Sequence, residues 1–117
     1  MFGLFKTKFD IIFNQKTKEQ FNLLLTEIHE ILRDSAYLAQ AKWIILILSS
    51  VQKEDSKKFQ QRVISAELLG GAGSIVDVWL EDEEKMKRLN CLLNAFFELT
   101  IKSGLNHRVI KSRMIKK

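Results

Sequence analysis

Residues 67–80 read Glu-Leu-Leu-Gly-Gly-Ala-Gly-Ser-Ile-Val-Asp-Val-Trp-Leu, and this stretch separates the helices expected on either side of it. It contains three of the five glycines among the 117 residues, namely Gly70, Gly71 and Gly73. Because glycine lacks a Cβ atom and adopts a left-handed conformation readily, we expect a helix to end at Gly70 or Gly71. A new helix is expected to begin at Ser74, with Asp77 completing a short capping motif. The stretch therefore predicts a sharp turn between two helices.

The same turn has a second interpretation. Unpaired backbone N–H groups ahead of a helix attract phosphate or carboxylate, so residues 70–77 are also a candidate anion, small-ligand or catalytic site that includes Asp77. The chain lacks the Gly-x-x-x-x-Gly-Lys-Ser/Thr pattern of a P-loop, and no strand is predicted before the glycines. We therefore favour a structural role for the glycines and a capping role for Asp77.

The spacing Gly-Gly-x-Gly-Ser-apolar-x-Asp resembles a pattern in a small, uncharacterised bacterial family of all-helical proteins, some of which are encoded near toxin and immunity genes. The matching residues are Gly70, Gly71, Gly73, Ser74 and Asp77, whereas Ala72 and Val76 stand at variable positions. The resemblance covers about residues 60–100. It implies a bacterial source and an all-helical fold more than an activity; joined to the lack of a convergent catalytic set, it favours an immunity protein that neutralises a cognate toxin. It implies no catalytic residue.

Apolar residues recur at helical spacing along most of the remaining chain. The expected helices cover residues 2–13, 17–33, 35–48 and 55–69, and the last one runs from the acidic residues 81–84 to Gly104. We expect their starts to be capped by Thr17, by Asp34 or Ser35, and by Asp55 or Ser56. The pattern predicts an all-α fold, a compact bundle of about five to six helices with the glycine-rich turn between the fourth and the fifth.

Two features indicate where the core lies. Residues 37–48 are apolar nearly all round, so their helix is expected to be central and buried. The β-branched residues of this segment also suit a strand, but no partner strand is predicted elsewhere. After the turn, Ile75, Val78 and Trp79 are expected to pack on the core, so that Trp79 anchors the turn.

The composition is that of a folded domain, with 46% hydrophobic and 28% charged residues. We expect a single helical domain over residues 1–104 and a basic C-terminal tail over residues 105–117. The amino terminus lacks the apolar run of a secretory signal, and the longest apolar run, residues 43–48, is too short to span a bilayer. A cytoplasmic protein is therefore expected.

Cys91 is the only cysteine, so a disulfide within the chain is excluded. Cys91 is expected to pack as a small apolar residue.

The net charge of +5 is concentrated at the carboxyl end. Residues 102–117 carry +6 and no acidic residue, which leaves −1 for the rest of the chain. This tail has two functional interpretations, binding to nucleic acid or to an acidic protein surface, beside that of a solvated terminus. We consider nucleic acid less favourable because the tail contains no aromatic residue on which bases stack.

Few residues suggest catalysis or metal binding. Glu27, Glu30 and Asp34 share one helical face and could hold a hard cation, although a solvated acidic face is far commoner. The segment from His29 to Arg33 lacks the second histidine of the zinc-protease motif. We therefore predict no catalytic residue, no metal and no cofactor.

The sequence favours a non-enzymatic protein-binding module, with an immunity protein as the specific form and a nucleic-acid-associated helical protein as the alternative. The expected partner is another protein, including a toxin or a second copy in a homodimer, and no membrane is expected. The candidate partner-surface residues are aromatic residues of the first helix, which otherwise belong to the core, and basic residues of the tail, namely Phe2, Phe5, Phe9, Arg108, Lys111 and Arg113.

Overall fold

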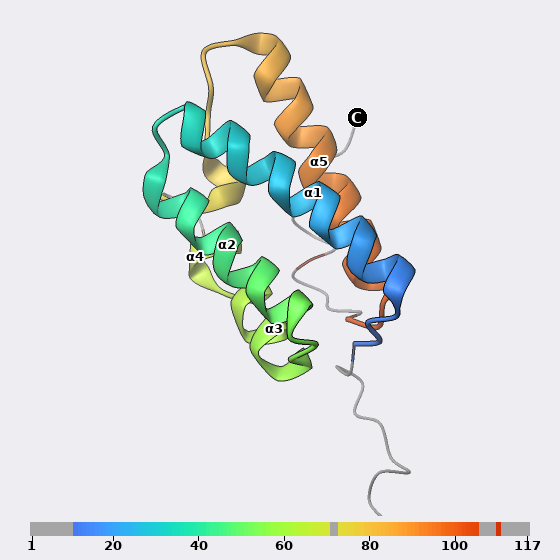
Figure 1. The fold of residues 1–117 in the computed structure, drawn as a ribbon. Coiled ribbons are helices and arrows are strands. Elements are labelled where there is room, and N and C mark those ends of the chain that lie inside the picture. Colours follow the sequence, from blue (N-terminus) through green and yellow to red (C-terminus); the bar gives the residue numbers. More distant parts are fainter. Residues whose placement is uncertain (1–10, 71–72, 106–109, 111–117) are drawn as a thin grey trace, which may run out of the picture.

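The structure, a computed structural model, describes residues 11–70, 73–105 and 110. Across these residues the chain forms helices joined by turns, without a strand. The helices are α1 (Gln15–Asp34), α2 (Leu38–Gln52), α3 (Ser56–Val63), α4 (Ala66–Leu69) and α5 (Glu83–Lys102), and a 3₁₀ turn, η2 (Ile75–Asp77), lies ahead of α5 (Figure 1). The prediction of a compact all-α fold is confirmed.

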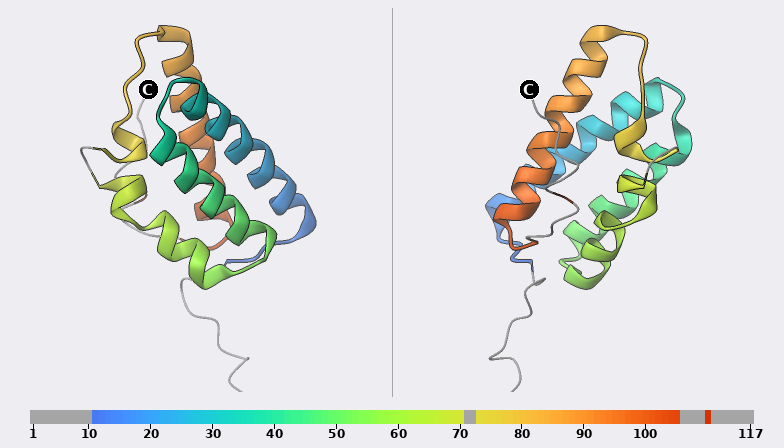
Figure 2. Two further views of the ribbon diagram at one scale, coloured as in Figure 1. Left: turned by 60° about the vertical axis from the view of Figure 1, so that its left-hand side comes forward. Right: turned by 180° about the vertical axis from the view of Figure 1, so that it is seen from behind.

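The bundle is arranged around α1, which packs against α2 on one side and α5 on the other (Figure 1). α1 and α2 form an antiparallel pair, and α3 packs along α2. Seen from behind, α5 lies on one side of the bundle, and the segment that contains α3 and α4 lies on the other (Figure 2). α4 packs against η2, so the two sides of the glycine-rich turn lie together.

The amino-terminal part of the bundle differs from the prediction. Residues 11–14 are not helical, so the helix predicted over residues 2–13 is wrong at its carboxyl end, and residues 1–10 lie outside the described part. The backbone N–H of Ile12 donates to the carbonyl of Ser103 at 3.0 Å, and that of Ile11 donates to the Ser56 hydroxyl at 3.0 Å. This extended segment therefore joins the end of α5 to the start of α3.

Two of the predicted helix caps are wrong. α1 begins before Thr17 because the Asn14 side chain accepts the Thr17 N–H at 2.9 Å. Neither Asp34 nor Ser35 caps α2, because α1 continues through Asp34 and Ser35 closes its end. The chain then reverses at Ala36, which has a φ of 66°, and α2 starts after Tyr37 without a side-chain cap.

The helix predicted over residues 55–69 is divided in two. Asp55 caps α3 as predicted, by accepting the Lys58 N–H at 3.0 Å. The helix then ends at Val63, and Ser65 caps α4. Between them the carbonyl of Arg62 accepts from the Trp43 indole at 3.0 Å and from the Ser65 hydroxyl at 2.6 Å. These two donors take the place of a continuing helical hydrogen bond at that carbonyl.

The last helix agrees with the prediction at both ends. Asp82 caps α5 by accepting the N–H groups of Glu84 and Lys85, and the acidic first turn matches the positive end of the helix dipole. Gly104, with a φ of 125°, follows the end of α5. Leu105 and Ile110 are completely buried, so the core includes two residues beyond the division predicted at residue 104.

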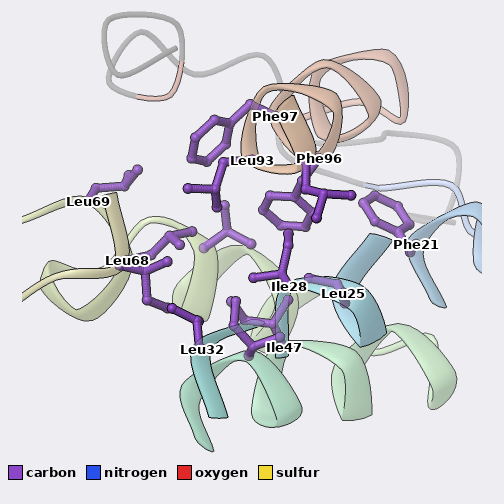
Figure 3. Close-up of a cluster of buried hydrophobic side chains, with 14 of the residues drawn as sticks. Phe21, Leu25, Ile28, Leu32, Ile47, Leu68, Leu69, Leu93, Phe96 and Phe97 are labelled. Carbon is purple, nitrogen blue, oxygen red and sulfur yellow. The ribbon is translucent and has the colours of Figure 1, made fainter. Parts of the chain in front are cut away.

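An aromatic cluster holds these elements together. Phe21 of α1, Phe59 of α3 and Phe96 of α5 are fully buried, with ring centroids 5.3 to 6.4 Å apart. Phe13 packs edge-on against Phe59 at 5.3 Å. Figure 3 shows aliphatic side chains of α1 and α5 continuing the core away from Phe21 and Phe96 toward α4. A single core therefore links helices that are distant in the sequence.

Truncating Phe59 is expected to cost about 3–5 kcal/mol of unfolding free energy, because Phe59→Ala leaves a cavity that three other rings line. Chemical denaturation of the purified variant measures this loss. Leu23→Ala is the matched control, since Leu23 is 70% exposed and its truncation should change stability by less than about 0.5 kcal/mol. Equal effects of the two changes would contradict the central place of the cluster.

Candidate functional site

The glycine-rich turn begins where α4 ends, and Gly70 is required there for a reason other than the predicted one. Gly70 has a φ of −91°, so it is not left-handed. A Cβ atom on Gly70 would lie 2.6 Å from the Ala66 Cα and 2.7 Å from the Ala66 carbonyl oxygen. The close approach of the backbone to the first residue of α4 therefore excludes a side chain. Gly71 and Ala72 lie outside the described residues.

Gly73 is the glycine of this turn that shows a left-handed conformation among the described residues. Its φ is +84°, and a Cβ atom placed on it would have no neighbour within 4 Å. Its carbonyl accepts a hydrogen bond from the Gln40 side chain of α2 at 3.0 Å. The backbone conformation, rather than a lack of space, thus favours glycine at this position.

Ser74 and Asp77 do not form the predicted capping motif. Ser74 precedes η2 with extended backbone, but its side chain makes no capping hydrogen bond, and η2 is a single 3₁₀ turn. The Ser74 hydroxyl is buried and has no hydrogen-bond partner among the described atoms. The N–H of Asp77 donates to the Ser74 carbonyl at 3.2 Å, and the Asp77 side chain is exposed. Asp77 therefore does not cap a helix, and anion binding by the turn stays a prediction.

Trp79 is exposed, which corrects its predicted place in the core. The backbone after η2 is extended, so neighbouring side chains alternate between two faces. Val78 and Leu80 are 5% and 6% exposed, whereas Trp79 is 65% exposed. Burial therefore alternates with a period of two in Val-Trp-Leu, directly before the acidic start of α5. Predicting this segment as helical overlooked that an extended segment of three apolar residues turns the middle one away from the core.

The carbonyl of Trp79 is held in place by Tyr37, the residue before α2. The Tyr37 hydroxyl donates to it at 2.8 Å, next to the start of that helix. Trp79 lines two open surface hollows of about 320 and 400 Å³. Leu80 and Glu81 line both, Met86 lines the first, and Asp34 lines the second. The carboxyl end of α1 and the amino end of α5 thus lie beside the exposed indole of Trp79.

The outward face of α2 is the second unusual surface. Leu38, Ile45 and Leu46 are 64%, 42% and 38% exposed, and Lys42 is the one charged residue of the helix. The opposite face is buried through Ile44 and Ile47. The prediction of a fully buried helix is therefore wrong, because α2 lies at the outside of the bundle and its apolar composition continues onto its exposed side.

The acidic face of α1 is partly neutralised by α5. Arg88 forms a two-pronged ion pair with Glu27, with Nε–Oε2 and Nη2–Oε1 distances of 2.5 and 2.7 Å. This hydrogen bonding lowers the pKa of Glu27 and raises that of Arg88. Glu30 and Asp34 lie along the same open hollow, and the described residues contain no cluster of three or more metal-binding side chains.

Most of the remaining predicted site residues lie outside the described part of the chain. Phe2, Phe5, Phe9, Arg108, Lys111 and Arg113 lie outside the described residues, so their role in a partner surface stays a prediction. Cys91 is exposed, contrary to its expected burial. In the described part of the chain, no helix is long and apolar enough to cross a membrane.

Comparison of the chain with protein families, with characterised proteins and with solved structures found no match. The resemblance of residues 70–77 to a bacterial family near toxin and immunity genes therefore stays an expectation. The function has to be argued from the surfaces described above.

Asparagine distinguishes Gly70 from Gly73. Gly73→Asn is expected to keep most of the stability, because asparagine tolerates a positive φ better than other non-glycine residues do. Gly70→Asn is expected to cost about 1–3 kcal/mol, because any Cβ atom there overlaps Ala66. Thermal unfolding of both variants measures the difference. A tolerant Gly70 and an intolerant Gly73 would overturn this account of the turn.

The Glu27–Arg88 pair predicts a small pH dependence of stability. Because folding lowers the Glu27 pKa, the pair stabilises the protein above the ordinary glutamate pKa, and this stabilisation is lost as pH falls through the lowered value. Glu27→Gln should therefore be slightly less stable than the parent at neutral pH and equally stable in strong acid. Both side chains are largely exposed, so added salt should shrink the difference. A difference that persists in strong acid would assign it to packing instead.

Proposed function

We propose that this chain is a non-enzymatic protein-binding module, and specifically a bacterial immunity protein that binds and neutralises a cognate toxin in the cytoplasm. The observation that carries the binding role is the outward face of α2. The resemblance of the glycine-rich turn to proteins encoded near toxin genes supports the specific form. In this proposal the turn of residues 70–74 is structural and supports the adjoining helices without binding a ligand.

The face of α2 has the character of a docking surface. A helix on the outside of a folded protein normally presents charged and polar residues to water. Here Leu38 is exposed at the start of α2, and Ile45 and Leu46 are exposed about two turns further along the helix. Exposed apolar residues that share the outer side of one helix favour protein interaction, because their burial against a partner is favourable by about 25 cal/mol per Å².

The bundle holds this face in a fixed position. Ile44 and Ile47 are fully buried on the core side of α2. The guanidinium of Arg62 donates to the Leu46 carbonyl, and the Trp43 indole donates to the Arg62 carbonyl, so α3 fastens the same helix. A partner would therefore meet a surface that needs little ordering on binding, which favours affinity.

The proposal predicts rescue of growth. Expressing the toxin encoded beside this gene should arrest a bacterial host, and co-expression of this chain should restore growth. The double variant Leu38→Ser, Ile45→Ser should lose rescue and bind the purified toxin at least about tenfold more weakly, because it removes apolar anchors from the α2 face.

The matched control is Ile12→Ser, Leu23→Ser, which removes two side chains that are 55% and 70% exposed outside α2. It should keep both rescue and affinity, and circular dichroism should show that all variants remain folded. Loss of rescue in the control alone would move the binding surface away from α2. Neighbouring genes without any toxic product would overturn the immunity assignment.

A further inference from the structure

Trp79 exposes a large apolar ring from a segment that is otherwise firmly packed. The flanking residues Val78 and Leu80 are buried, and the Tyr37 hydroxyl fixes the Trp79 carbonyl at 2.8 Å. The ring itself is 65% exposed. A tryptophan held out from a rigid backbone loses little conformational entropy on binding, and tryptophan is among the residues that most often dominate protein interfaces.

The surface beside Trp79 combines apolar and acidic groups. The two hollows on which it borders contain the half-buried side chains of Met86 and Tyr37. Carboxylates surround these apolar groups, and lysines stand among them. The acids of the two hollows are Asp34, Glu81, Asp82 and Glu83, and the bases are Lys85 and Lys87. The surface therefore suits a ligand that presents apolar side chains between positive charges.

The sequence contains a segment with this chemistry. Residues 63–84 include six acidic residues and no lysine or arginine, whereas residues 99–117 include six basic residues and no acid. Within the basic part, residues 111–117 read Lys-Ser-Arg-Met-Ile-Lys-Lys, so that Met114 and Ile115 stand between positive charges. Oppositely charged surfaces steer association and fix its orientation. The charges of this chain are thus complementary to one another.

We propose that Trp79 and the two hollows beside it form a docking surface for residues 111–117 of a second copy of this chain. Met114 and Ile115 pack on the Trp79 ring, and the basic residues pair with the surrounding carboxylates. This self-association goes beyond the immunity function and uses Trp79 rather than the exposed residues of α2. The variants that test the two proposals are therefore different.

Sedimentation of the chain of residues 1–117 tests this proposal. At low salt the chain should associate reversibly with rising concentration, and the association should weaken as salt screens the charges. Trp79→Ala should weaken it at least about tenfold, because the change removes the apolar anchor. Lys111→Glu, Arg113→Glu should weaken it similarly, because the occupant then repels the acidic surface.

Mixing the two variants gives the decisive result. The Trp79→Ala chain keeps an intact tail, and the Lys111→Glu, Arg113→Glu chain keeps an intact docking surface. Neither should self-associate strongly, but an equimolar mixture should form a heterodimer through the one remaining contact. Failure of the mixture to associate would overturn the proposal, even if each variant alone behaved as expected.

Two controls separate specific from general effects. Leu23→Ala removes another exposed apolar side chain, and Lys57→Glu, Lys58→Glu makes the same charge change on exposed residues of α3; both should leave association unchanged. A chain that stays monomeric at all concentrations would overturn docking between copies. Loss of binding to a short DNA duplex in the tail variant but not in Trp79→Ala, without self-association, would assign the tail to nucleic acid instead.

Discussion

The packing of Phe59 against Phe13, Phe21 and Phe96 is the contact on which the remaining structure depends. α3 has only eight residues, and a helix of that length is not stable in water without tertiary packing. Phe59 supplies that packing and places the end of α3, where Arg62 joins α2 and the chain turns into α4. The position of the glycine-rich turn, and through it that of Trp79, therefore follows from contacts between rings that are 37 to 46 residues apart in the sequence.

Local signals in the sequence predicted the parts of the fold that depend on local physics. α5 has a strong helical period, an acidic start and a glycine just beyond its end, and Asp55 lies directly before α3, so these elements were found. The division between α3 and α4 was not predictable in this way. It depends on the Trp43 indole, which reaches the Arg62 carbonyl from another helix. Likewise, the clash that makes Gly70 necessary involves the backbone of Ala66 and depends on how tightly α4 closes.

The surfaces were harder to predict than the core, for two different reasons. Residues 43–48 of α2 are all apolar, so periodicity cannot indicate which of Ile44 and Ile45 faces water; the arrangement of neighbouring helices decides it. Around Trp79 the signal existed but had a period of two within a sequence that was otherwise helical. An apolar residue was assigned to the core in both places because burial is the commoner outcome for its type.

The two tryptophans give the protein a pair of built-in optical probes. Trp43 is half-buried, with its indole N–H bonded to the Arg62 carbonyl, so its emission depends on the junction of α2 with α3. Trp79 faces water, so its emission lies at longer wavelength and is open to quenching by dissolved iodide. Tryptophan fluorescence of one unlabelled sample can therefore follow two events separately: unfolding of the bundle, and binding at the surface beside Trp79.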